Sequence, residues 1–159
     1  MKKLFLLATF FVLLSSSAEA QNIRGGDFYF RAGATGVDFS FSDKMYVGLA
    51  IDGGYFVADN WAIGALIGIN HYDSVTGFSL LANVSHYFLE TDIGALFGRV
   101  GLGLDREQKI NSFVVDVSAG YSIFVTDEIA IEPTAGFLIP FKNGRDASFR
   151  LGVAFSLYF

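Results

Sequence analysis

Hydrophobic residues occupy every second position along most of this chain, with polar or small residues between them. In the last segment, Phe149, Leu151, Val153, Phe155, Leu157 and Phe159 alternate with Arg150, Gly152, Ala154, Ser156 and Tyr158. Successive side chains of a β-strand point to opposite faces, so this segment predicts a strand with one apolar and one mixed polar face. Transmembrane barrels are built from such strands, whose apolar residues face lipid and whose polar or small residues face the lumen.

Eight alternating segments follow one another along the chain, and short polar breaks separate them. They cover residues 27–41, 45–57, 61–72, 77–88, 93–104, 112–125, 129–139 and 147–159. Each is at least as long as the roughly 9–11 residues with which a tilted strand crosses a bilayer. Because every break is short, neighbouring strands should pair as antiparallel hairpins. The chain is therefore predicted to be all-β, an eight-stranded antiparallel up-and-down transmembrane β-barrel.

Two positions interrupt the regular alternation. In the first segment Phe28 and Phe30 face outward, but Val37 and Phe39 then take the outward parity, so a β-bulge is expected between residues 33 and 36. Pro133 lies in the middle of the seventh segment, where a closed sheet needs a backbone donor that proline lacks. We expect a second local bulge there.

The N-terminal residues have the pattern of a secretory signal peptide. Lys2 and Lys3 form a basic start, residues 4–14 are apolar, and residues 18–20 are a small-x-small cleavage site. The apolar run is shorter than the roughly 20 residues of a membrane-spanning helix. We expect residues 1–20 to be cleaved and residues 21–159 to form one barrel domain. The alternative is an uncleaved membrane anchor.

The composition excludes several classes of function. The chain has no cysteine, which excludes disulfides and thiol chemistry. Its formal net charge of −5 argues against a nucleic-acid partner, because nucleic-acid binding needs a basic face.

The alternation places charged residues on the inward face of the predicted barrel. They are Arg31, Arg99 and Arg150, and Asp52, Asp116 and Glu132, three of each sign. An eight-stranded barrel is just wide enough for side chains to fill it, and charges held there must be paired. We therefore predict a polar core that closes the lumen. The alternative interpretation is a gate or a proton path.

The inward charges suggest particular pairs. Arg99 and Asp116 are symmetric about a loop centred near Gln108, which predicts that they lie opposite each other. Arg31 with Asp52, and Glu132 with Arg150, also lie on neighbouring strands, but their registers are expected to be offset.

Charge also separates the two sets of connections. In bacterial barrels both termini are periplasmic, so the connections after the odd strands are expected to be extracellular. They carry all five basic loop residues, Lys44, Arg106, Lys109, Lys142 and Arg145, whereas the charged residues of the opposite turns are all acidic. This asymmetry suggests contacts with lipopolysaccharide phosphates. Ordinary solvation is the alternative, because acidic residues share the basic loops.

The sequence offers few candidate catalytic groups. Asp73 and Ser74 follow His71 closely, but neighbours at a strand end do not easily converge into a triad. His86 has no acidic neighbour on its face. No catalytic residue, metal site or cofactor is predicted.

The C-terminal strand resembles the sorting signal of bacterial outer-membrane barrels, carried here by Gly152, Phe155, Leu157 and Phe159. The stretch 54–64 is similar to the strand-turn-strand units of the small OmpA/OmpX-type barrels, also described as porin-like barrel domains. This resemblance implies a protein of the Gram-negative outer membrane, exported by a Sec-type signal and inserted by the barrel-insertion machinery. Outer-membrane lipid would be its partner, and we expect a monomer.

The resemblance leaves the activity open. A non-conducting barrel with a structural, envelope-integrity or surface-interaction role is the first hypothesis. A narrow channel for water or small solutes is the second, and an outer-membrane lipid hydrolase using His71 is the third. A soluble lipocalin-like barrel, with its apolar faces turned inward, is the remaining alternative for the fold.

Overall fold

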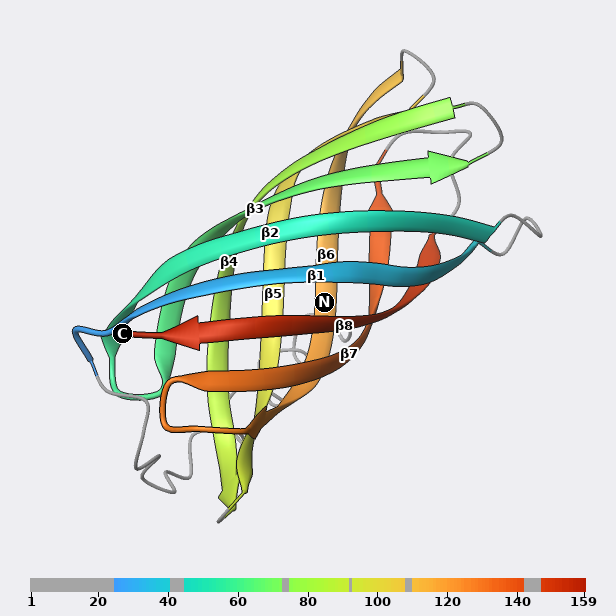
Figure 1. Cartoon of the computed structure of the whole chain (residues 1–159). Coiled ribbons are helices and arrows are strands. Elements are labelled where there is room, and N and C mark those ends of the chain that lie inside the picture. Colours follow the sequence, from blue (N-terminus) through green and yellow to red (C-terminus); the bar gives the residue numbers. More distant parts are fainter. Residues whose placement is uncertain (1–24, 41–44, 73–74, 92, 108–109, 142–146) are drawn as a thin grey trace, which may run out of the picture.

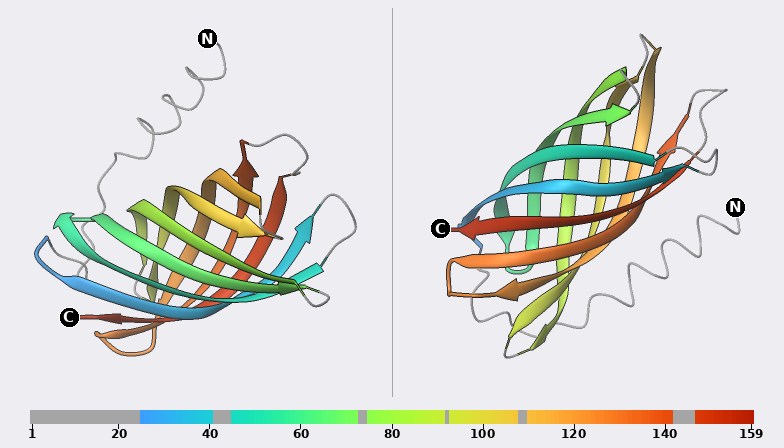
Figure 2. Two further views of the ribbon diagram at one scale, coloured as in Figure 1. Left: turned by 90° about the horizontal axis from the view of Figure 1, so that it is seen from above. Right: turned by 45° about the vertical axis from the view of Figure 1, so that its right-hand side comes forward.

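The computed structural model describes residues 25–40, 45–72, 75–91, 93–107, 110–141 and 147–159. The strands are β1 (Phe28–Ser40), β2 (Met45–Ala58), β3 (Trp61–Tyr72), β4 (Val75–Thr91), β5 (Gly94–Glu107), β6 (Ile110–Phe124), β7 (Ile129–Pro140) and β8 (Ser148–Tyr158). Each pairs antiparallel with the next, and β1 also pairs with β8, so the eight strands form a closed barrel. Figure 1 shows β1 and β8 side by side, and Figure 2 shows the strands wrapped around one interior. The predicted fold is confirmed.

The two faces of the sheet are those that the alternation predicts. Large apolar side chains cover the outside; Leu49 and Phe155, for example, are 69% and 63% exposed. Inward positions alternate with them and are buried or half-buried, as in β8, where Ser148, Ser156 and Tyr158 are buried. A soluble lipocalin-like barrel would have the opposite arrangement. Within the described residues, no helix is long and apolar enough to cross a membrane.

The predicted bulge in the first strand is confirmed. The pairing of β1 with β2 shifts between Thr35 and Val37, and its pairing with β8 shifts between Ala34 and Val37. The extra residue at this point explains the change of parity, because one unpaired residue exchanges the two faces of a strand.

The bulge predicted at Pro133 is wrong. Pro133 pairs with Val153 in an unshifted β7–β8 register, and the β6–β7 register is the same on both sides of it. Only the pairs that Pro133 and Glu132 would form with β6 are missing from the ladder. Pro133 is exposed on the outer face. A missing donor therefore interrupts one ladder locally without adding a residue.

The β5–β6 hairpin is longer than predicted. The segment 105–111 was expected to be a loop, but β5 continues to Glu107, which pairs with Ile110. Asp105 pairs with Ser112 inside this extension, and both side chains are buried. The inward face of β5 therefore continues to Asp105, past Leu104, the last apolar residue of its outer face.

Aromatic rings fill one end of the lumen. They belong to Tyr29, Phe56, Tyr87, Phe97 and Tyr158, called here the aromatic cluster, and none is more than 4% exposed. Ring centroids lie 5.2 Å apart for Tyr87 and Phe97 and 5.5 Å apart for Phe56 and Tyr87. Buried Ala62, Ala95 and Ala130, near the first residues of β3, β5 and β7, complete the layer. The cluster therefore lies at the end of the barrel where the β2–β3, β4–β5 and β6–β7 turns are.

Candidate functional site

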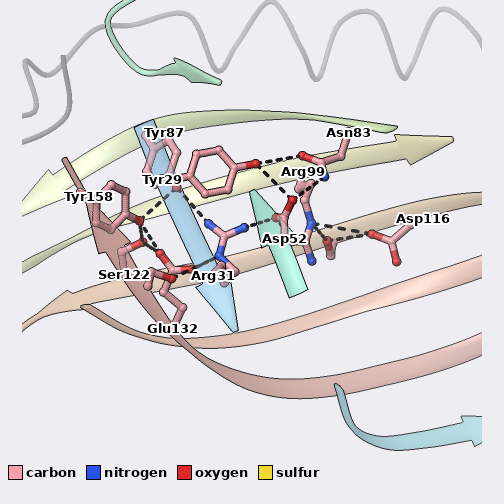
Figure 3. Close-up of polar contacts among 12 residues, drawn as sticks. Tyr29, Arg31, Asp52, Asn83, Tyr87, Arg99, Asp116, Ser122, Glu132 and Tyr158 are labelled. Atoms are coloured by element: carbon pink, nitrogen blue, oxygen red, sulfur yellow. Dashed lines mark hydrogen bonds and ion pairs between the residues drawn. The ribbon is translucent and has the colours of Figure 1, made fainter. Parts of the chain in front are cut away.

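Arg31 lies among the polar groups of the lumen, beside the Tyr29 and Tyr87 rings of the aromatic cluster (Figure 3). Its Nη1 donates to Asp52 Oδ2 at 2.8 Å, its Nε pairs with Glu132 Oε2, and its Nη2 donates to the Tyr87 hydroxyl at 3.1 Å. The guanidinium is thus held between two carboxylates from β2 and β7. Arg31, Asp52 and Glu132 are at most 4% exposed.

Asp52 accepts hydrogen bonds from several strands. Arg99 Nη1 donates to Asp52 Oδ2 at 3.2 Å, and Asn83 Nδ2 donates to Oδ1 at 2.9 Å. The Tyr29 hydroxyl lies 3.3 Å from the same Oδ1. A buried carboxylate is stable only when its lone pairs are satisfied, and here two arginines and two neutral donors satisfy them.

Glu132 is held in the same way on the other side of Arg31. Ser122 Oγ donates to Glu132 Oε1 at 2.6 Å, and the Tyr158 hydroxyl donates to that oxygen as well. The described contacts of Glu132 therefore come from β1, β6 and β8. Arg31, Asp52, Arg99, Asp116 and Glu132 together are called the ion network below.

The register differs from two of the expected pairs. Arg31 lies directly opposite Asp52, not offset from it. Arg99 lies opposite Ser118, and Asp116 lies opposite Gly101. The pairing of Glu107 with Ile110 sets a register whose centre lies one residue later than the register that would place Arg99 opposite Asp116. Arg99 Nε still reaches Asp116 Oδ1 at 4.0 Å along the diagonal.

The structure does not bring Glu132 and Arg150 together as a cross-strand pair. Glu132 lies opposite Ala154, and Arg150 lies opposite Gly136. Glu132 instead pairs with Arg31, whose strand is two away because β8 lies between β1 and β7. Arg150 lines a cavity with Arg99 and Asp116 further along the lumen.

Sequence reasoning missed several polar members of the lumen. Asp105 is buried and accepts a hydrogen bond from Ser79 Oγ at 2.6 Å, which adds a fourth inward carboxylate to the expected balance of three charges of each sign. Asp105 lies six residues after Arg99 and therefore on the same face of the strand. A prediction that extended the fifth segment to residue 105 would have placed Asp105 in the lumen. Tyr29, Tyr87 and Tyr158 also contribute hydroxyls to the network. The expected polar core was built from charged residues, so these tyrosine hydroxyls were not part of it.

The remaining candidate residues lie elsewhere. Lys44, Lys109, Lys142 and Arg145 lie outside the described residues, and Arg106 is exposed on β5, not in a loop. On β8, Phe155 and Leu157 are exposed on the outer face and Gly152 faces the lumen, and Phe159, directly after the strand, is exposed as well.

The histidines do not form a recognisable catalytic group in the described part of the chain. His71 is exposed, and its Nδ1 lies 3.3 Å from Thr76 Oγ1. Asp73 and Ser74 lie outside the described residues. The centroid of the His86 ring lies 4.2 Å from that of Trp61 and 6.2 Å from that of Phe88. Among the described residues, no group of three or more His, Cys, Asp or Glu could hold a metal ion.

Comparison with known structures identifies the fold. The β-barrel domain of OprF from Pseudomonas aeruginosa matches with a TM-score of 0.67 at 15% identity, over 85% of this chain and 98% of that one. Neisserial surface protein A (NspA) matches with a TM-score of 0.67 at 16% identity, over 84% of this chain and 96% of NspA. The chain has the fold of the small outer-membrane β-barrels. No protein-family model and no curated protein matches the sequence.

An enzyme also has this outer-membrane barrel fold. The outer-membrane enzyme PagL matches with a TM-score of 0.53 at 12% identity, over 82% of this chain and 98% of PagL. The fold therefore does not decide between a catalytic and a non-catalytic barrel; only the side chains can distinguish them.

Proposed function

We propose that this protein is an integral outer-membrane barrel of a Gram-negative bacterium that does not conduct and that has a structural or surface-interaction role in the envelope. The observation that carries the proposal is the combination of an apolar outer face with a lumen filled by paired charges and packed rings. A barrel that faces lipid outside needs no further cover, and a filled interior leaves no open pore.

Single-channel conductance of the refolded protein in a planar bilayer tests the proposal. We expect no conductance, because the ion network and the aromatic cluster fill neighbouring levels of the lumen and block it. A stable conductance that changes on Arg99→Ala or Asp116→Ala substitution would contradict it. Such a result would support the second candidate, a narrow channel for water or small solutes, which the small cavities beside Arg99 favour.

The hydrolase hypothesis has less support. The described contact of His71 is with the Thr76 hydroxyl. A catalytic histidine needs a carboxylate to orient its ring and to stabilise the imidazolium, and a neutral hydroxyl does not do this. We therefore propose that the barrel is not an enzyme.

The end of the last strand and the apolar outer face suggest the partners of the barrel. The last part of β8 together with the residue after it, carrying Gly152, Phe155, Leu157 and Phe159, is proposed as the segment that the barrel-insertion machinery reads. Lipid covers the outer face, and the barrel is proposed to be a monomer.

Lipopolysaccharide is the proposed contact of the basic residues. Neutralising Lys44, Arg106, Lys109, Lys142 and Arg145 together should weaken association with lipopolysaccharide vesicles by at least roughly tenfold, since one basic residue near an anionic lipid surface contributes about 1 kcal/mol. Flotation with lipopolysaccharide vesicles measures this. Neutralising the acidic pair Asp127 and Glu128 at the opposite end is the matched control. Equal binding by the wild-type and five-residue variants would exclude the contact.

A further inference from the structure

The outer face of the barrel carries small residues at one place on three adjacent strands. Gly53 on β2 pairs with Ala65 on β3, which pairs with Ala82 on β4, and all three face outward. Phe30 on β1 and Leu102 on β5 continue the row at its two ends. The wall therefore lacks a large side chain in one row across three neighbouring strands.

Larger apolar side chains enclose these small residues, and together they form a groove of about 1050 Å³. Phe30 and Leu102 border its two ends. The adjacent row on one side, which also borders the groove, consists of Phe28, Tyr55, Ile63, Val84 and Val100. On the other side the next row contains Ile51, Ile67 and Leu80, all exposed. The groove, called here the wall groove, therefore has a floor of small residues and apolar sides.

The packing of the barrel does not require a glycine at position 53. A Cβ there would come no closer than 3.7 Å to another residue, the Tyr29 carbonyl oxygen, and Gly53 has no left-handed φ. At the inward Gly54, in contrast, a Cβ would clash with the carbonyl oxygen of Ile63. The strand has no bulge at Gly53. A glycine inside a strand often marks a place where a ligand approaches closely, and the free space at Gly53 lies outside the barrel.

The wall groove is several strands long and about as wide as one row of side chains. Its ends on β1 and β5 are four strand spacings apart, roughly 19 Å. The rows on either side of its floor are four residues apart along a strand, roughly 13 Å between Cα atoms, and their side chains narrow this space. A single flexible chain fits such a shape. The wall of a second barrel curves away from this one, so it could reach the floor only with isolated side chains.

Lipid is the occupant that the surroundings of the wall groove supply. The groove is continuous with the exposed apolar face that the proposed function places in the membrane. Lipid tails are as apolar as this wall, so a chain in the groove gains packing contacts rather than transfer out of water. The rings of Phe28 and Tyr55, whose centroids are 4.9 Å apart, add flat surface at the β1 end. A chain that fills the groove therefore makes contacts that a chain elsewhere on the outer face lacks.

We propose that the wall groove binds one acyl chain of a membrane phospholipid, which lies over Gly53, Ala65 and Ala82 and stays with the barrel longer than the lipids around it. The proposal rests on the outer-membrane function above, because it needs lipid at the outer face. It adds to that function a lipid site on the wall that β1 to β5 form. The groove recognises the hydrocarbon chain and not the headgroup, since its sides are apolar.

Native mass spectrometry of the refolded protein tests this proposal. The probe is phosphatidylcholine with two oleoyl chains, supplied in detergent micelles, because its headgroup has no net charge for the basic residues to select. Ala65→Phe fills the floor of the wall groove. Ala119→Phe is the matched control, because Ala119 is an exposed alanine on β6 that does not border the groove. We expect the wild type and Ala119→Phe to retain one phospholipid per barrel, and we expect loss of this lipid from Ala65→Phe.

Other results would overturn the lipid site. A wild type that retains no phospholipid, or equal retention by Ala65→Phe and Ala119→Phe, would show that the groove does not hold a chain. A wild-type dimer that Ala65→Phe separates would assign the groove to a second copy instead. If Ala65→Phe fails to fold, as judged by gel mobility without heating, Ala82→Phe fills the same floor. Flotation with phosphatidylcholine vesicles separates the two proposals. A wild type that floats but retains no lipid overturns only the groove, whereas one that does not enter the vesicles overturns the membrane function as well.

Discussion

Substituting Arg31 with methionine should lower the free energy of unfolding by about 3–5 kcal/mol, the cost of breaking a buried ion pair by removing one partner. Arg31 is the cation that the described structure places between Asp52 and Glu132, and both carboxylates are almost fully buried. Asp52 keeps Arg99 after the substitution, but Glu132 keeps only neutral hydroxyl donors, among them Ser122 and Tyr158. The unpaired charge of Glu132 therefore dominates the loss.

Urea unfolding in detergent micelles measures this effect, with the fluorescence of Trp61, the single tryptophan, as the probe. Arg106→Met is the matched control, because Arg106 is an exposed arginine on β5. The double variant Arg31→Met with Glu132→Leu should be more stable than Arg31→Met alone, since it removes the unpaired carboxylate. A single variant as stable as the Arg106→Met control would show that the ion network contributes nothing to stability.

Gly64→Ala should destabilise the barrel by about 1–3 kcal/mol, the usual effect of adding a methyl group to a well-packed interior. A Cβ at Gly64 would lie 2.1 Å from the Tyr29 hydroxyl and 2.9 Å from the carbonyl oxygen of Gly53. Tyr29 would have to move, and its hydroxyl would leave Asp52 and Asn83. Glycine at this position therefore allows a ring of the aromatic cluster to reach the ion network.

Gly68→Ala is the matched control for this substitution. Gly68 lies on the same strand and the same inward face, but its Cβ would come no closer than 3.6 Å to Ser79. We expect a change within about 0.5 kcal/mol, as for most substitutions that create no clash. The same urea titration compares the two variants, and equal stability would show that Tyr29 yields without cost.

Alternation alone predicted which side chains face outward and which face inward. This succeeded because a strand has a strict period of two and because the barrel offers two environments of opposite polarity. Val37 and Phe39 even revealed the bulge in β1, since a single extra residue reverses the parity. Arg31, Asp52 and Glu132 were placed in the lumen on the same basis.

The contacts across the lumen could not be predicted from alternation. Arg31 pairs with Glu132 although β8 separates their strands, and Arg99 reaches Asp52, three strands away. Such partners depend on the tilt of the strands and on the exact register. A shift at the centre of one hairpin was enough to displace Asp116 from its expected position opposite Arg99.

The pairing of β1 with β8 has a consequence for how the chain folds. The other ladders join strands that are neighbours in sequence, whereas this one brings Tyr29 beside Tyr158. The entropy of closing so long a loop is lost before the contacts across the seam form. Until then both edge strands expose unpaired backbone groups, and Arg31 lacks Glu132. Partly assembled sheets should therefore be poorly populated, and closure should be highly cooperative, with the final strand deciding whether the interior forms at all.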